Sequence, residues 1–334
     1  MRWLQEPDLR DPIHFLDDIS SRLEAGEDVA GTMKTLCDGL WWLRRHWPGE
    51  EWVHFCAVAR QHRLAALVHQ DPFTHRSFAK PRGYPGDANL IDMIYYDQGV
   101  ADLGSPTPLG LKIFDSNKDS TAPAAVRERR DFAARLIDET CSAVNGGAIL
   151  SVAGGHAREL SLSAAVRQRA FGRMVVLDQD ADSLEIVRRE YASLGVETHA
   201  AKVTRLLAAP ELRASFDLVY SAGLYDYLQD QLAERLTAAM FSLLRPGGRL
   251  IIGNFVPGIY DAGYMESYMD WWLIYRDGGQ MTALAASLPQ ADVSSVRTYT
   301  LSHTDVVYLE VRRRRQPLVA VSSPPTRQAA AGVV

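Results

Sequence analysis

Four short apolar runs, separated by helical segments, constrain the fold of this chain more than any other feature. The runs read AILSV at 148–152, RMVVLD at 173–178, FDLVYS at 216–221 and RLIIGNF at 249–255. None alternates cleanly between apolar and polar residues, as expected when helices cover both faces of a parallel sheet. Helical periodicity is expected at 124–143, from Arg158 onward, at 182–194 and at 230–244. This order predicts an α/β domain over about residues 126–315.

The end of the chain departs from this alternation. A short strand is expected at VETHAA (196–201), and two more near 295–300 and 305–312 have no helix between them. Consecutive strands without a crossover helix pair antiparallel. We therefore expect the sheet to end in a hairpin, and the tail 316–334 to be disordered.

Two further regions are expected before the α/β domain. Residues 1–70 are predicted to be helical, and the first helix should begin at Pro12 after the cap Asp11 and stop at Gly26. Residues 71–125 contain several prolines, and the residue before a proline is disfavoured in a helix. We predict a largely extended, lid-like loop segment there.

Composition argues against several classes of protein. The 36 Lys and Arg and 41 Asp and Glu give a net charge of −5, which disfavours a nucleic-acid surface. No stretch approaches the roughly 18 apolar residues of a membrane span, and we expect no signal peptide. Cys37, Cys56 and Cys141 stand apart without a CxxC pair. We therefore expect no disulfide framework, no metal site and a cytoplasmic location.

In ILSVAGGHAREL (149–160) an apolar strand is followed by two glycines and a helix start. Such loops commonly hold a nucleotide-like ligand. Gly154, Gly155 and His156 do not form the GxGxxG motif, and no P-loop motif occurs. At the tip of the next strand, Asp178 is placed to accept hydrogen bonds from two ribose hydroxyls. A ligand with a ribose and no diphosphate, such as S-adenosylmethionine (SAM), therefore fits better than NAD.

The ordered elements, with FDLVYSAGLYDYL and LLRPGGRLII, resemble the class I SAM-dependent methyltransferases over residues 126–312. Three stretches, KPRGYPGDANLIDMIY, SAGLYDYL and GNFVPGIYDAGYMESYMDWWLIYR, resemble the methyltransferase family of extracellular factor 3-hydroxypalmitic acid methyl ester biosynthesis over most of residues 70–312. The resemblance implies an α/β, Rossmann-like class I methyltransferase sheet with a C-terminal antiparallel hairpin, an N-terminal helical region and a lid loop. It implies SAM as the cofactor. Since such families usually include members with different acceptors, it does not identify the acceptor.

The resemblance also implies which residues contact SAM. They are Gly154, Gly155, His156, Glu159, Asp178, Gln179, Val203, Ser221 and Gly223, with Tyr84 and Asp87 from the lid-like segment. Glu159 is expected to reach the ammonium group of SAM directly or through a neighbour. The chain departs from the superfamily pattern at Ser151, where an acidic residue is usual. It also has Ala153 and Ala157 for the outer glycines, and Lys202 where an Asp often binds adenine.

Tyr84, Tyr225, Asp226 and Asn254 are the residues expected nearest the reaction. Asp226 orients the acceptor or acts as a base, or alternatively caps the helix that begins near Gln229. Asn254 contacts the acceptor or satisfies loop backbone. A carboxylate acceptor needs no base, whereas a hydroxyl or ammonium must lose a proton. We expect catalysis chiefly by alignment and desolvation.

The residues expected to bind the acceptor are Arg82, Tyr264, Tyr268, Trp271 and Arg276. Arg82 attracts an anionic acceptor, or else forms the solvated edge of a rigid turn. Tyr264, Tyr268 and Trp271 share a face with Tyr275 at helical spacing, so they line the site or pack in the core. Arg276 anchors a carboxylate, or pairs with Asp270 or Asp277.

The sequence thus predicts transfer of a methyl group from SAM to a carboxylate or hydroxyl oxygen, or a nitrogen, of a small-molecule metabolite. Specialised or signal-molecule biosynthesis is the expected setting. One alternative is a SAM-binding protein without transferase activity, and a second is an NAD-dependent oxidoreductase. We expect no nucleic-acid or membrane partner, and the oligomeric state stays open.

Overall fold

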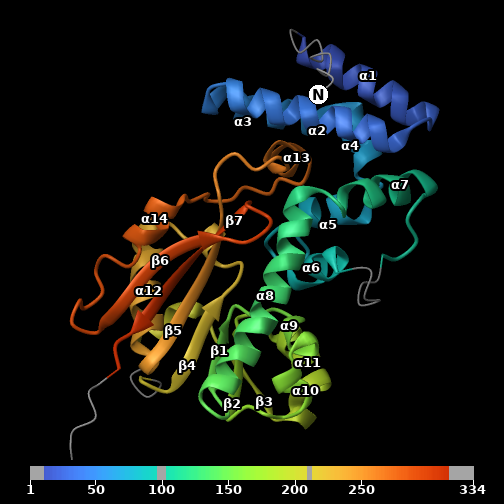
Figure 1. Ribbon diagram of the computed structural model, residues 1–334. Helices are drawn as coiled ribbons and strands as arrows, with labels where there is room; N and C mark the ends of the chain where they lie inside the picture. The colour runs from blue at the N-terminus through green and yellow to red at the C-terminus, as the bar shows by residue number, and fades with distance from the viewer. Residues whose placement is uncertain (1–10, 96–102, 209–212, 316–334) are drawn as a thin grey trace, which may run out of the picture.

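The computed structural model describes residues 11–95, 103–208 and 213–315 (Figure 1). Within them a seven-stranded sheet has the order β3-β2-β1-β4-β5-β7-β6. The strands are β1 (Ala148–Val152), β2 (Arg173–Asp178), β3 (Val196–Ala200), β4 (Phe216–Ser221), β5 (Leu244–Phe255), β6 (Val293–Thr300) and β7 (Val306–Arg313). Strands β1 to β5 run parallel, whereas β7 pairs antiparallel with β5 and β6. The predicted α/β sheet with a C-terminal hairpin is confirmed.

Helices cover both faces of this sheet. One face carries α8 (Thr121–Ala143), α9 (Glu159–Leu162), α10 (Ala164–Arg167) and α11 (Ala181–Tyr191), and the other carries α12 (Asp230–Ser242) and α14 (Gly278–Ala283). Successive strand residues point to opposite faces, so Ile149 packs with the first group and Leu150 with the second. The predicted helix from Arg158 is divided, because Ser163 ends α9 and caps α10.

Four helices form the N-terminal region: α1 (Pro12–Ala25), α2 (Val29–His46), α3 (Gly49–Gln61) and α4 (Arg63–Val68). Helix α1 begins and ends as predicted, since Asp11 caps it and Gly26 ends it with a φ of 72°. The four helices lie over the end of the sheet where the parallel strands finish (Figure 1). There α2 and α3 pack on α13 (Ala262–Tyr268), which follows β5. A partly buried ion pair of 2.7 Å between Arg44 Nε and Glu266 Oε2 joins the helices there.

The segment 71–125 is more helical than predicted. It contains α5 (Pro72–Ala79), α6 (Ala88–Ile94) and α7 (Pro108–Asn117), and α8 begins at Thr121. The prediction of a mostly extended chain is wrong because two prolines stand at the first position of a helix, where a missing N–H costs nothing. Asp71 and Thr107 cap these helices with their side chains. Residues 80–87 form a turn between α5 and α6, which we call the lid turn.

The aromatic insert, residues 257–277, is helical only from Ala262 to Tyr268. Helix α13 ends at Tyr268, and the chain then runs irregularly to Gly278. The prediction that Trp271 and Tyr275 share a helix face with the two tyrosines before them is therefore wrong. No described helix has the length and apolarity to cross a bilayer. The predicted disordered tail, 316–334, lies outside the described residues.

Candidate active site

A cavity of about 590 Å³ opens where β1, β2 and β4 finish. Its walls come from the loops after these strands, from the lid turn, from α6 and α8, and from α13. The volume is in the range of small-molecule sites. Polar groups line the part beside β1 and β2. Apolar side chains line most of the part beside α13, which we call the apolar chamber: Phe73, Ile94, Val126, Phe255, Tyr264, Met265, Trp271 and Leu273. Asn117 and Asp261 line it as well, bonded to Tyr264 and to the start of α8.

The glycine loop after β1 is held by its own hydrogen bonds. Ala153, Gly155 and Ala157 adopt positive φ values of 55°, 55° and 49°. The N–H of Ala157 donates to the carbonyl of Gly154, and the N–H of Gly155 donates to Asp178 Oδ2, both at 2.8 Å. A diphosphate is bound by free N–H groups at the start of a helix. The helix here, α9, has four residues, so this loop does not fit a diphosphate.

Asp178, at the tip of β2, is almost fully buried and lines the cavity. Its Oδ2 accepts from the N–H of Gly155 and its Oδ1 from the N–H of Asp180, at 2.8 and 2.9 Å. Each carboxylate oxygen can accept a second hydrogen bond. Gln179 and Val203 line the cavity beside it. The capacity for two ribose hydroxyls, expected from the sequence, is therefore present.

Glu159 is joined to a residue that the sequence did not single out. The hydroxyl of Tyr220 donates to Glu159 Oε1 at 2.6 Å, and both side chains line the cavity. Burial raises the pKa of Glu159, and the hydrogen bond from Tyr220 opposes this. Tyr220 lies in β4 within a run of buried residues, where its hydroxyl is the only polar side-chain group before Ser221. A tyrosine in a buried strand needs a hydrogen-bond partner for its hydroxyl. This requirement is the sequence signal that could have identified Tyr220 as a site residue.

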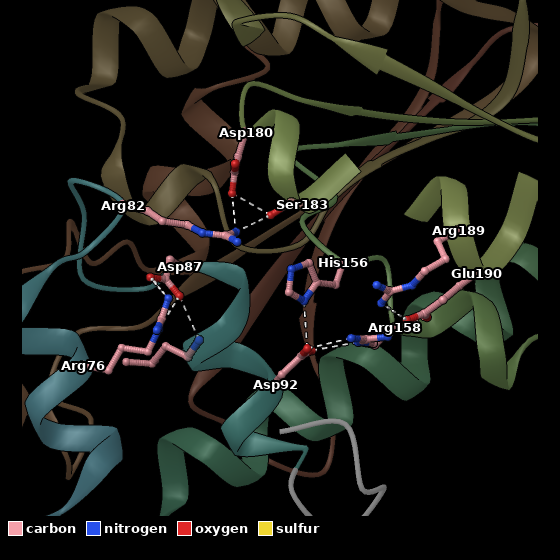
Figure 2. A network of polar contacts seen from close by, with 11 residues as sticks. Arg76, Arg82, Asp87, Asp92, His156, Arg158, Asp180, Ser183, Arg189 and Glu190 are labelled. Carbon is pink, nitrogen blue, oxygen red and sulfur yellow. Dashed lines mark hydrogen bonds and ion pairs between the residues drawn. The ribbon is translucent and has the colours of Figure 1, made fainter. Parts of the chain in front are cut away.

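The lid turn is held from the cofactor side by Arg82. Its guanidinium pairs with Asp180 and donates to Ser183 Oγ at 2.8 Å, next to the start of α11 (Figure 2). Arg82 also lines the cavity, and because its charge is paired with Asp180, its role in attracting an anionic acceptor stays a prediction without support from this contact. Asp87 also has a structural role, because it caps α6 and pairs with Arg76 at 2.8 Å, and it does not line the cavity.

On its other side the lid turn packs against the aromatic insert. A Cβ on Gly86 would lie 2.5 Å from Tyr227 Oη and 2.7 Å from Trp271 Cζ2. Trp271 Nε1 donates to Tyr227 Oη at 2.8 Å. Tyr84 lines the cavity, and burial together with Asp178 raises its pKa to about 12. The lid turn thus closes one wall of the cavity.

Asp226 and Arg129 face each other between the glycine loop and the apolar chamber. Asp226 Oδ1 accepts from the N–H of Phe255 at 2.7 Å, and its Oδ2 lies 3.7 Å from Arg129 Nη1. Both residues are buried and line the cavity. Arg129 Nη1 has no hydrogen-bond partner among the described residues. Burial raises the pKa of Asp226 to about 6, although Arg129 opposes the rise.

Sequence analysis missed Arg129. It lies on the buried face of α8, with Ala125, Val126 and Ala133 at the spacing of one helix stripe. A charged residue on such a stripe is unusual, because a buried charge requires a partner. Gly223 gives it room, since a Cβ there would lie 3.0 Å from Arg129 Nη2.

Six predicted site residues do not line the cavity: Tyr225, Asn254, Ser221, Asp87, Tyr268 and Arg276. Arg276 is buried, and its Nη1 donates to Asn254 Oδ1 at 2.9 Å and to the carbonyl of Tyr225 at 2.8 Å. Its Nη2 pairs with Asp230 at 2.6 Å, so the predicted carboxylate anchor and the predicted pairings with Asp270 or Asp277 are wrong. These groups instead support the loop that carries Asp226.

The remaining two of these residues pack inside the fold. Ser221 Oγ donates to the carbonyl of Val152 at 3.0 Å. Tyr268 is fully buried in the helical core. Of the predicted aromatic wall, Tyr264 and Trp271 line the cavity. No cluster of three or more His, Cys, Asp or Glu able to hold a metal ion occurs in the described parts of the chain.

Comparisons with known proteins agree with this site. Residues 149–248 match the family model described as a methyltransferase domain. No curated protein matches the chain. A crystal structure of a possible exported protein from Bordetella parapertussis has a TM-score of 0.56 at 17% identity, over 81% of this chain and 98% of that one. It shares the fold.

Two other solved structures are less similar. The SAM-dependent methyltransferase SibL in its apo form has a TM-score of 0.45 at 17% identity, over 73% of this chain and 70% of that one. The 1,6-didemethyltoxoflavin-N1-methyltransferase of Burkholderia thailandensis, solved with 1,6-didemethyltoxoflavin and S-adenosylhomocysteine, has a TM-score of 0.39 at 14% identity, over 56% of this chain and 79% of that one. With the glycine loop, Asp178 and the order of the sheet, the match at 149–248 shows that the chain contains a SAM-dependent methyltransferase domain.

Proposed function

We propose that this protein methylates a hydroxyl oxygen of a small, largely apolar molecule, with SAM as the methyl donor. The observation that carries the proposal is the pair formed by Arg129 Nη1 and Asp226 Oδ2, which lie 3.7 Å apart in the cavity wall. An oxygen at hydrogen-bond distance from both atoms, about 2.8 Å, would bridge them. A hydroxyl group accepts from the guanidinium and donates to the carboxylate, whereas a second carboxylate would be repelled by Asp226.

The apolar chamber supports an acceptor with an apolar body. Phe255 contacts both Arg129 and Asp226, and Met265 and Leu273 line the same cavity. Burial of apolar surface contributes roughly 25 cal/mol per Å², so the body of the acceptor would supply most of its affinity. The resemblance of 80–95 and 253–276 to the family of 3-hydroxypalmitic acid methyl ester biosynthesis supports only the apolar body of the acceptor and a setting in specialised or signal-molecule biosynthesis, because a methyl ester forms on a carboxyl oxygen.

The residues proposed to hold SAM lie along the ends of β1, β2 and β4. Asp178 would accept the ribose hydroxyls, with Gln179, Val203 and Tyr84 beside the nucleoside. Bound SAM supplies an electrophilic methyl group on a sulfonium. Gly223 lies between this part of the cavity and Arg129, so the chain would align the acceptor oxygen with that methyl group, and alignment accounts for much of the rate.

Three observations bear on the alternatives and the setting. The N–H groups of Gly155 and Ala157 in the glycine loop already donate within the protein, which argues against binding the diphosphate of NAD. A buried guanidinium nitrogen without a partner, beside an apolar chamber, argues for a second ligand and against a cofactor that is only structural. All three cysteines are free, which supports a reducing compartment such as the cytoplasm.

A methyl-transfer screen tests the proposed function. The protein is incubated with SAM and panels of apolar molecules that carry a hydroxyl, a carboxyl or an amino group, and S-adenosylhomocysteine is quantified. We expect product with hydroxyl acceptors. Turnover only with carboxylates or amines would contradict the assignment of the acceptor. Binding of SAM without turnover of any acceptor would favour the non-catalytic alternative.

The pH dependence of the reaction should follow Asp226. Its pKa is raised to about 6 by burial, and a base must be unprotonated to accept a proton. We therefore expect kcat/KM for a hydroxyl acceptor to rise with pH between about 5 and 7 and then to level off. Asp226→Asn should abolish this rise with pH and lower the value of kcat/KM above pH 7 by about 100-fold. A profile that falls above pH 6, or a variant that keeps the rise, would show that Asp226 is not the base.

A further inference from the structure

His156 is a buried imidazole with one nitrogen satisfied and one free. The residue follows the two glycines after β1 and is among those that line the cavity, with its side chain almost fully buried. Nδ1 lies 2.8 Å from Asp92 Oδ2, on α6 (Figure 2). Nε2 is buried and has no hydrogen-bond partner among the described residues. A buried polar atom left unpaired destabilises the folded state, so this nitrogen is a candidate ligand contact.

Asp92 is itself held in place by Arg158. Arg158 Nε donates to Asp92 Oδ1 at 2.8 Å and Nη2 to Oδ2 at 2.7 Å, a bidentate pair (Figure 2). Arg158 Nη1 also pairs with Glu190, on α11, at 2.6 Å. Burial acts to raise the pKa of Asp92, but the hydrogen bonds from Arg158 and His156 outweigh it and lower the pKa. The carboxylate is therefore ionised.

The ionised carboxylate decides the tautomer of His156. A carboxylate can only accept hydrogen bonds, so Nδ1 of His156 carries the proton and donates to Asp92. Arg158 pairs with both Asp92 and Glu190, and Arg189 also pairs with Glu190 at 3.7 Å. Two guanidiniums thus balance the two carboxylates, and no proton on Nε2 is required. Nε2 then presents a lone pair to the cavity and is a hydrogen-bond acceptor.

The order of the strands indicates which donor meets this lone pair. β1 lies between β2, which carries Asp178, and β4, whose following loop carries Asp226. If the ribose lies at Asp178 and the methyl group is transferred near Asp226, the sulfur and the methionine portion of SAM lie between them, beside the end of β1. The α-amino group is the hydrogen-bond donor of that portion.

We propose that Asp92 and Arg158 are positioning residues that aim Nε2 of His156 at the amino group of the methionine portion of SAM. The proposal rests on the proposed use of SAM. Helix α6 belongs to the region before the sheet, so the cofactor site is completed from outside the methyltransferase domain. Ala88, also on α6, supports this docking, because a Cβ on Gly155 would lie 3.2 Å from its Cβ.

Two ligands distinguish contacts to the amino-acid portion of the cofactor from contacts to its nucleoside. S-adenosylhomocysteine carries the amino-acid portion, whereas 5′-methylthioadenosine carries the nucleoside and sulfur without it. We would measure the Kd of both by calorimetry for the wild-type protein, His156→Asn and Asp92→Asn. In His156→Asn the amide can still donate to Asp92 in place of Nδ1, but nothing replaces Nε2.

For His156→Asn we expect the Kd of S-adenosylhomocysteine to rise about tenfold or more, the effect of one lost hydrogen bond, and the Kd of 5′-methylthioadenosine to stay within about twofold. Asp92→Asn should weaken binding of S-adenosylhomocysteine by a smaller factor and again leave binding of 5′-methylthioadenosine unchanged. The His156 imidazole would lose the carboxylate that orients it but would keep Nε2. An equal loss for both ligands, or no loss for either, would overturn the proposal.

A measurement on the wild-type protein removes any dependence on folding of the variants. The ¹⁵N resonances of the His156 imidazole should show a protonated Nδ1 and an unprotonated Nε2. The Nε2 resonance should shift when S-adenosylhomocysteine is added, and not when 5′-methylthioadenosine is added. A protonated Nε2, or a shift with both ligands, would overturn the proposal. If the wild-type protein binds S-adenosylhomocysteine with these signatures but methylates no acceptor, the proposed function fails. The proposal that Asp92 and Arg158 position His156 would then still hold.

Discussion

Replacing Arg129 by methionine is expected to lower kcat/KM for the methyl acceptor by about 100-fold and to leave the Kd of SAM unchanged. The guanidinium is buried beside Asp226, and its Nη1 has no partner among the described residues. Loss of a charged hydrogen bond in a buried site costs about 1.5–3 kcal/mol, and each 1.4 kcal/mol is a factor of ten. Methionine keeps an unbranched apolar stem and removes the charged head, together with its contact with the Phe255 ring.

The Arg129 variant needs a control, because it leaves the Asp226 carboxylate buried without its cation. An unpaired buried charge destabilises the fold by several kcal/mol. The double variant Arg129→Met with Asp226→Asn removes both charges and should regain thermal stability without regaining activity. Unchanged kcat/KM in a folded Arg129→Met protein would contradict the placement of the acceptor beside Arg129.

Replacing Gly155 by valine is expected to weaken binding of SAM and S-adenosylhomocysteine by about 100-fold or more. Gly155 has a φ of 55°, which is costly for a β-branched residue. Its Cβ would lie 3.2 Å from that of Ala88, so the larger side chain would move α6 or fill the cavity. It would also displace the N–H that donates to Asp178. Calorimetric titration measures the loss of affinity.

A matched control separates backbone strain from occlusion of the site. Gly26 ends α1 with a φ of 72°, and a Cβ there meets no atom within 4 Å. Gly26→Val should lower thermal stability to a similar degree while SAM binds normally. If the two variants lose stability alike and Gly155→Val still binds SAM tightly, the assignment of the glycine loop to the cofactor is wrong.

The methyltransferase sheet was predictable because its signals are local. Each strand is a short apolar run, and burial on both faces removes the alternation that a half-exposed strand would show. The cap Asp11 and the stop Gly26 of the first helix are likewise encoded within a few residues. The helices of segment 71–125 were harder to predict, because a proline in the sequence does not show whether it interrupts a helix or begins one. Pro72 and Pro108 begin helices.

The candidate site was predictable only where its residues stand next to strand ends. Gly154, Gly155, Asp178 and Asp226 were found in this way, and they line the cavity. Asn254 stands at a strand end too, yet its side chain donates to the carbonyl of Phe255 and accepts from Arg276. Position along a strand specifies where a Cα lies, but the partner of a side chain depends on elements that are distant in the sequence.

The sequence by itself determined the class of fold, and it located the glycine loop and the carboxylate at the tip of β2 that line the cavity. These depend on periodicity, on residues without a Cβ and on the tips of neighbouring strands. The tertiary structure decided which groups meet in the cavity: Arg129 from α8 faces Asp226, and Asp92 from α6 anchors His156. The physical reason is that buried polar groups must find partners, and those partners come from segments that only the packed fold brings within hydrogen-bond distance.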